Sequence, residues 1–176
     1  MGTEKNAADS RPLAEVTISL LEKAGYEVIL PNKLDNLCCG MPYKSKGFVD
    51  TAANKAQELE NSLWQISEQG KFPVLMDTSP CASLSKETMR QGITILEPFK
   101  FVADFVLPKL DITPQDEPVM LHITCTSRRS GLAGVMQKVT EACAKQVIIP
   151  EDILCCGFAG DKALPRQSSM PLPLRR

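Results

Sequence analysis

The residues best suited to chemistry in this chain of 176 residues are its seven cysteines. Four of them form two identical triplets, Cys38-Cys39-Gly40 and Cys155-Cys156-Gly157. Adjacent cysteines do not easily form a disulfide with each other, because the small ring is far from relaxed disulfide geometry. Their thiolates are better placed to bind a shared third group, so each triplet predicts a site for a metal ion or an iron-sulfur cluster.

The sequence before each triplet is also repeated. An apolar segment at 26–30 ends at Pro31 before the first triplet, and a similar segment at 145–149 ends at Pro150 before the second. Each segment reads as a strand that a proline stops, followed by a loop that carries thiols. The glycine of the triplet lets the backbone turn closely around whatever the sulfurs bind.

Three further cysteines stand alone. Cys81 follows a Ser-Pro pair that predicts the start of a helix, where free amides and the helix dipole favour a thiolate. Cys125 lies three residues after His122, the only histidine, which could complete a mixed Cys/His site but is expected to bond a neighbouring loop. Cys143 lies on the apolar side of a predicted helix and is expected to pack in the core.

Helices and strands are predicted to alternate along the chain. Helical periodicity covers four segments, 11–24, 47–69, 101–106 and 132–142. Strand-like apolar segments lie at 26–30, 72–76, 93–96, 119–123 and 147–149. This order predicts an α/β fold of duplicated strand-helix units with a mostly parallel sheet and with the cysteine loops at the carboxyl ends of the strands.

A polar stretch at 111–118 is the predicted boundary between two halves. We therefore expect a first repeat over residues 1–110 and a second, truncated repeat over residues 111–162. Residues 163–176 contain three prolines and no periodicity, so this tail is expected to be disordered.

Composition excludes several classes of function. A net charge of −1 gives no basic surface for nucleic acid. The polar start of the chain is no secretory signal, and no apolar run approaches the roughly 20 residues that a membrane span requires. We expect a cytoplasmic protein, free or peripheral on the inner face of a membrane. No GxGxxG or GxxxxGK motif is present, so no residue is expected to bind FAD.

Five stretches of the sequence together resemble the CCG cysteine-rich domain family: LLEKAGYEVILP, LCCGMPYKSKG, DTSPC, HITCTSRR and LCCGFAGDK. This family includes a subunit of heterodisulfide reductase, the iron-sulfur subunit of glycolate oxidase, and the C-terminal part of respiratory FAD-dependent D-lactate dehydrogenases. The chain departs from the family pattern in three places. The first repeat lacks its opening cysteine, Leu84 stands where a Cys-x-x-Cys would end, and the second repeat lacks its closing pair.

The resemblance implies metal ligands and a role in electron transfer. The cysteines that match the family's ligands are Cys38, Cys39, Cys81, Cys125, Cys155 and Cys156. They would hold a 4Fe-4S cluster, although neither repeat keeps four thiolates, so the cluster is expected to bind poorly unless the halves pool their sulfurs. The implied function is the iron-sulfur portion of a flavin-dependent D-lactate or other 2-hydroxy-acid dehydrogenase, which passes electrons from FAD to a quinone or cytochrome.

On this interpretation the chain carries no catalytic residue, because hydride chemistry belongs to FAD on a separate domain of the parent protein or complex. The fragment alone is expected to be an inactive part of the enzyme. Two alternatives remain open from the sequence: a zinc-stabilised structural or docking module, and a thiol-disulfide redox module like heterodisulfide reductase. Basic residues near the thiol loops either offset cluster charge or form solvated faces; they are Lys44, Lys46, Arg128 and Arg129.

Overall fold

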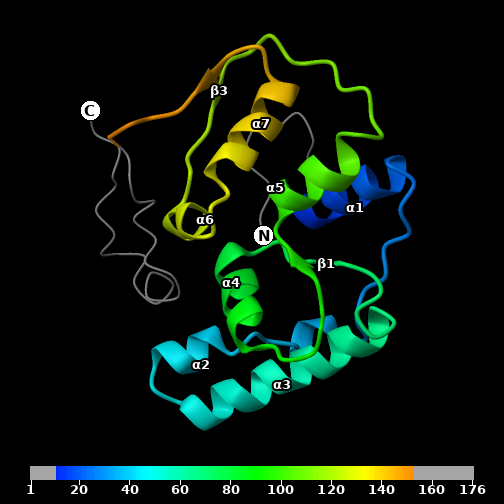
Figure 1. The fold of residues 1–176 in the computed structure, drawn as a ribbon, viewed down its shortest axis with the longest axis vertical. Helices are drawn as coiled ribbons and strands as arrows, with labels where there is room; N and C mark the ends of the chain where they lie inside the picture. The colour runs from blue at the N-terminus through cyan, green and yellow to red at the C-terminus, as the bar shows by residue number, and fades with distance from the viewer. Residues whose placement is uncertain (1–10, 153–176) are drawn as a thin grey trace.

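The computed structural model describes residues 11–152 and shows a mixed α/β fold in which helices alternate with short parallel strands (Figure 1). This confirms the predicted fold class. The second triplet, Cys155-Cys156-Gly157, and the predicted disordered tail at 163–176 lie outside the described residues.

The first helix, α1, covers Leu13–Lys23, as the periodicity of 11–24 predicts. The chain turns away two residues after the helix at Gly25, whose φ of +80° is a left-handed conformation that favours glycine. Leu21 of α1 is buried against Phe101 and Val106, which come from a helical segment far along the chain. α1 therefore covers one end of the core.

The prediction of a strand at 26–30 is wrong, since this segment has no regular secondary structure. No described strand pairs with it, because β1 and β2, defined below, pair only with each other. Tyr26 and Val28 instead pack against the cluster around Phe101, while Ile29 and Leu30 are each 56% exposed. An apolar run alone does not make a strand when no partner provides the hydrogen bonds.

A helical hairpin carries the first triplet. After a short 3-10 turn, η1 (Leu34–Asn36), the chain passes through the triplet into α2 (Met41–Ser45) and then into the long α3 (Val49–Ile66). The sequence pattern at 47–69 predicts α3 but not α2. Leu59 and Leu63 of α3 are buried, and they place this helix against the triplet and α4.

The first parallel pair of strands consists of β1 (Val74–Leu75) and β2 (Ile95–Leu96), with α4 (Ser79–Thr88) between them. Parallel strands need such a crossover, because the chain must return to the end where it started. α4 begins at the predicted Ser-Pro pair, so Cys81 lies in its first turn.

The next helical segment connects the first pair of strands to the second. α5 (Pro98–Phe101) continues without a break into η2 (Val102–Val106), where the hydrogen bonds take the wider π pattern. Phe101 and Phe105 stack at 4.9 Å between ring centroids, and Tyr26 contacts both edge to face. This aromatic cluster fastens the segment after α1 to the centre of the chain.

The second parallel pair consists of β3 (Val119–Met120) and β4 (Val147–Ile148). The crossover between them holds α6 (Cys125–Arg129) and α7 (Ala133–Cys143). It therefore repeats the order of the first pair, with a cysteine at the first turn of the helix that follows the strand. The strands predicted at 72–76, 93–96, 119–123 and 147–149 are thus correct in kind and each is shorter than predicted.

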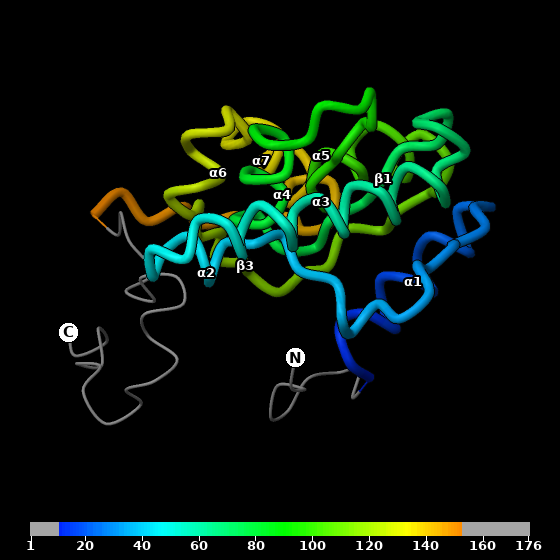
Figure 2. Tube along the Cα trace, turned by 90° about the horizontal axis from the view of Figure 1, so that it is seen from below, coloured from blue at the N-terminus to red at the C-terminus, as the bar shows by residue number. Residues whose placement is uncertain are grey.

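The two pairs of strands remain separate sheets, and helices connect them. α4 packs against α6, and α5 and η2 pack against α7. In both views α1 lies on the opposite side of the molecule from α2 and α6 (Figures 1 and 2). None of the helices described is long and apolar enough to cross a membrane.

Candidate functional site

Cys39 and Cys81 meet at the centre of the candidate site. Cys39 comes from the loop before α2 and is only 4% exposed, while Cys81 comes from the first turn of α4 and is partly buried. Their Sγ atoms are 3.1 Å apart, close enough for a hydrogen bond between a thiol and a thiolate. The structure therefore brings together two of the six cysteines that the sequence predicts as ligands.

The triplet loop is held by the close approach of two helices. Gly40 has φ of +85° and forms the N-cap of α2. A side chain at this position would collide with the carbonyl oxygen of Ala52 in α3, so the loop requires glycine. The N–H of Gly40 donates a hydrogen bond to the sulfur of Cys38 at 3.4 Å, which turns this partly buried thiol back towards its own backbone.

The pKa values of the two neighbouring thiols are shifted in opposite directions. A hydrogen bond from Cys81 lowers the pKa of Cys39 to about 6, although burial opposes this shift. The same hydrogen bond, together with burial, raises the pKa of Cys81 far above that of an ordinary thiol. The hydrogen bond therefore favours one thiolate and one thiol in the pair, with Cys39 the more acidic of the two. Thiolates are the form that binds metals and attacks electrophiles.

Cys125 occupies the equivalent position in the second half. It is the first residue of α6, whose preceding residue Thr124 caps the helix by accepting a hydrogen bond from Ser127 N at 3.3 Å. Its side chain is exposed. α6 packs against α4, which carries Cys81, so the two helix starts belong to neighbouring elements. Within residues 11–152, however, no three Cys, His, Asp or Glu side chains surround a common point.

The remaining predicted residues are placed as follows. Cys155 and Cys156 lie outside the described part of the chain. The Nε2 atom of His122 is buried, and no described residue bonds to it, so the expected bond to a neighbouring loop is not seen at this nitrogen. Cys143 ends α7 and is only partly buried, and this burial raises its pKa, so its predicted packing role stays a prediction.

A shallow cleft of about 290 Å³ lies beside the thiol loops and was not predicted from the sequence. It is lined by residues of α2, α4 and α6, including Met41, Pro80 and Thr126, each next to a triplet or a candidate cysteine. Lys44 and Arg129 also line it. No periodic pattern could have indicated this cleft, because it depends on how three separate helices pack.

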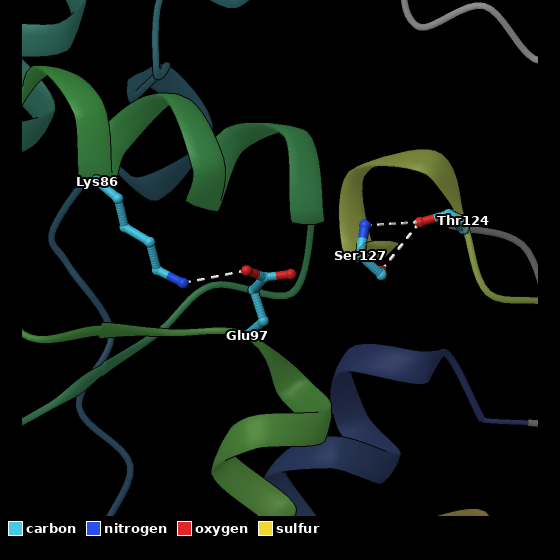
Figure 3. A network of polar contacts seen from close by, with 4 residues as sticks. All are labelled: Lys86, Glu97, Thr124 and Ser127. Carbon is cyan, nitrogen blue, oxygen red and sulfur yellow. Dashed lines mark hydrogen bonds and ion pairs between the residues drawn. The ribbon is translucent and has the colours of Figure 1, made fainter. Parts of the chain in front are cut away.

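An ion pair between a buried carboxylate and a partly exposed lysine lies beside α4, which packs against α6. Glu97 is 1% exposed, and its Oε1 accepts a hydrogen bond from Lys86 Nζ of α4 at 3.0 Å, as Figure 3 shows. Its other oxygen, Oε2, is buried and has no partner among the described residues. In the same view the cap formed by Thr124 and Ser127 lies across from this carboxylate. The signal in the sequence is only an acidic residue directly after β2, which a surface loop would show as well.

Comparison with known families gives the chain its class. The cysteine-rich domain, CCG, matches residues 4–83 and 119–173, which is most of the chain. The chain therefore belongs to the CCG cysteine-rich domain family, as the resemblance of the five stretches predicts. Domains of this family are typical of iron-sulfur redox proteins. No solved structure matches the chain significantly.

Proposed function

We propose that this chain is the iron-sulfur electron-transfer portion of a flavin-dependent 2-hydroxy-acid dehydrogenase, whose substrate is D-lactate. The observation that carries the proposal is the meeting of Cys39 and Cys81 at 3.1 Å, from two separate loops of a CCG domain. Two sulfurs that converge from the loop before α2 and from the first turn of α4 support a role as ligands of a shared group.

The donor set suits an iron-sulfur cluster in kind, since every candidate ligand is a thiol. The proposed ligands are Cys38, Cys39 and Cys81 from the first half and Cys125, Cys155 and Cys156 from the second. When bound, a 4Fe-4S cluster supplies reversible one-electron transfer. The chain contributes a thiolate at Cys39, the amide of Gly40 beside Cys38, and two cationic side chains, Lys44 and Arg129, along the neighbouring cleft.

Oxidation of the hydroxy acid is assigned to FAD on a separate domain or subunit. The reason is that the sequence offers no nucleotide-binding motif and the chemistry of hydride removal belongs to the flavin. The chain on its own would then show no dehydrogenase activity and would pass electrons to a quinone or a cytochrome. The parent gene tests this assignment. Flavin-oxidase sequence joined to the domain supports it, and separate ferredoxin-like partner subunits favour the disulfide-reducing alternative.

The test of the cluster is the iron, sulfide and zinc content of the full chain after anaerobic reconstitution, together with its visible absorption spectrum. We expect iron and sulfide in near-equal amounts and a brown colour in wild type and in the control variant Cys143→Ser. Cys39→Ser and Cys81→Ser should each lose most of the iron. Zinc without iron would contradict the proposal and identify the structural alternative, and iron uptake that survives both substitutions would remove these residues from the site.

A further inference from the structure

We propose that Cys39 and Cys81 are also a redox-modification site, at which a hydroperoxide converts the metal-free thiol pair into an intramolecular disulfide. The two sulfurs already lie 3.1 Å apart, so a bond between them requires a movement of about 1 Å. Cys81 is only partly buried, which gives a small oxidant access to the pair.

The neighbouring thiols are less suited to this bond. Cys38 is adjacent to Cys39 in the chain, where a disulfide would be strained, and its sulfur accepts a hydrogen bond from the Gly40 amide. Cys125 is exposed at the start of α6, and Cys143 lies at the end of α7. Among the described cysteines, the pair of Cys39 and Cys81 is therefore the favoured place for a disulfide.

The reaction uses the hydroperoxide as its oxidant and balances in two steps. One sulfur of the pair, as the thiolate, attacks the terminal peroxide oxygen; the O–O bond breaks, and water or an alcohol leaves, with a sulfenic acid on the protein. The second sulfur then attacks the sulfenic sulfur, the S–S bond forms, and water leaves. The two thiols lose two electrons, and the peroxide gains them. A small dithiol reverses the change by exchange.

The disulfide would compete with metal binding, and this consequence alone rests on the proposed function. Both sulfurs are proposed ligands, and neither can bind iron as a thiolate while they are bonded to each other. Oxidised chain would therefore stay metal-free until it is reduced. Loading of the cluster would then depend on the thiol-reducing capacity around the protein.

Tryptic peptides make the bond easy to locate. Cleavage after Lys33 and Lys44 gives peptide 34–44, which contains Cys38 and Cys39, and cleavage after Lys71 and Lys86 gives peptide 72–86, which contains Cys81. Reduced, metal-free full chain is treated with hydrogen peroxide, its remaining thiols are alkylated, and the digest is analysed by mass spectrometry. We expect the two peptides joined by one disulfide, and their separation after treatment with dithiothreitol.

The variants decide which sulfurs react. Cys38→Ser and the distant control Cys143→Ser should keep the joined peptides, while Cys39→Ser and Cys81→Ser should lose them and accumulate sulfenic acid on the remaining thiol, which a dimedone probe detects. Joined peptides in Cys39→Ser would show that Cys38 is the true partner and would overturn the inference. So would a wild-type digest in which Cys81 is alkylated throughout or is bonded to another cysteine.

Iron uptake separates this inference from the proposed function. If oxidised chain takes up at least tenfold less iron than reduced chain, and dithiothreitol restores the uptake, both stand. If the peptides join but reduced chain takes up no iron, the proposed function fails and the disulfide stands. If reduced chain takes up iron and no joined peptides form, the disulfide fails and the proposed function stands.

Discussion

At the scale of single residues, the central feature of the site is the hydrogen bond between the sulfurs of Cys39 and Cys81. Cys39 is buried against Leu59, Leu63 and Leu84, an environment that by itself would disfavour a thiolate. The hydrogen bond with the Cys81 sulfur reverses this preference and lowers the pKa of Cys39, and backbone hydrogen bonds in the loop act in the same direction. The Cys81 side chain is thus the largest of several contacts that favour the thiolate form of Cys39.

The first prediction concerns this titration in the reduced, metal-free protein. The ultraviolet thiolate absorbance that Cys39→Ser removes from wild type should titrate near pH 6, well below the ordinary thiol value of 9.0. Cys81→Ala, which removes the sulfur and leaves no donor in its place, should move this titration up, because burial then acts without that hydrogen bond. Cys143→Ser should leave it unchanged, and a wild-type midpoint near 9.0 would contradict this effect of the hydrogen bond.

The lowered pKa of Cys39 also makes the free energy of unfolding depend on pH in a defined direction. Because the folded pKa of Cys39 lies below its unfolded value, the unfolded chain binds more protons between pH 6 and pH 9. The contribution of Cys39 to the free energy of unfolding is therefore fully present above about pH 9 and is lost as the pH falls through about 6. Urea unfolding of wild type and Cys39→Ser across this range measures the difference.

At the scale of elements, the turn from the triplet into α2 depends on contact with α3. Gly40 and Gly47 both have φ of +85°, but only Gly40 lies against another backbone segment, at Ala52. Gly47→Ala should cost about 1 kcal/mol for the left-handed conformation alone. Gly40→Ala should cost at least about 2 kcal/mol, because the new methyl group must also push the two helices apart.

Urea denaturation of the two variants measures these costs, and anaerobic iron uptake reports whether the thiol loop has moved. We expect Gly40→Ala to lower both quantities and Gly47→Ala to leave iron uptake unchanged. Equal losses of stability in the two variants would show that the contact with α3 does not hold the loop.

Local pattern explains which elements were predictable. The apolar spacing along Val49–Ile66 and the Ser-Pro pair before Cys81 are properties of adjacent residues, and both helices form as predicted. The segment 26–30 has an equally strong local pattern and forms no strand, because strand formation needs a partner that sequence spacing does not reveal. Cys125 was predicted to follow a strand, but the short helix that begins there was not, since five residues carry too little periodicity.

The candidate site, too, was predictable from the sequence only in part. The cysteine side chains, the repeated triplet and the family resemblance were sufficient to predict Cys39 and Cys81 as ligands. The structure places their sulfurs side by side. Their unequal acidity, the contact of Gly40 with Ala52 and the cleft between three helices arise only from packing between distant segments. Sequence reasoning can therefore find the chemistry of such a site before it can find its geometry.

At the scale of the whole molecule, a buried carboxylate lies behind the helix that connects the two strand-helix units. Glu97 lies between β2 and α5 and is neutralised by Lys86 of α4, while α4 itself packs on α6 of the second half. A buried charge without its partner is strongly unfavourable. The ion pair therefore holds α4, the helix that packs on α6, against the segment that follows β2.

Substitution of Lys86 tests this role. Lys86→Met should lower the free energy of unfolding by about 2 kcal/mol, because the carboxylate of Glu97 stays buried without its partner. The control is Lys71→Met, which removes the exposed pair of Lys71 and Glu68 at 2.7 Å and should cost about 0.5 kcal/mol or less. Equal losses in the two variants would show that Glu97 contributes no more than a surface pair.

The separation of the two thiols along the chain also matters for the unfolded state. Cys39 and Cys81 are 42 residues apart, with all of α3 between them. A bond between them would close this segment into a loop and remove conformational entropy from the unfolded chain, equivalent to about 4 kcal/mol for a loop of this size. Oxidised, metal-free protein would then resist unfolding better than the reduced form that is ready to bind metal, so greater thermal resistance would mark the less functional state.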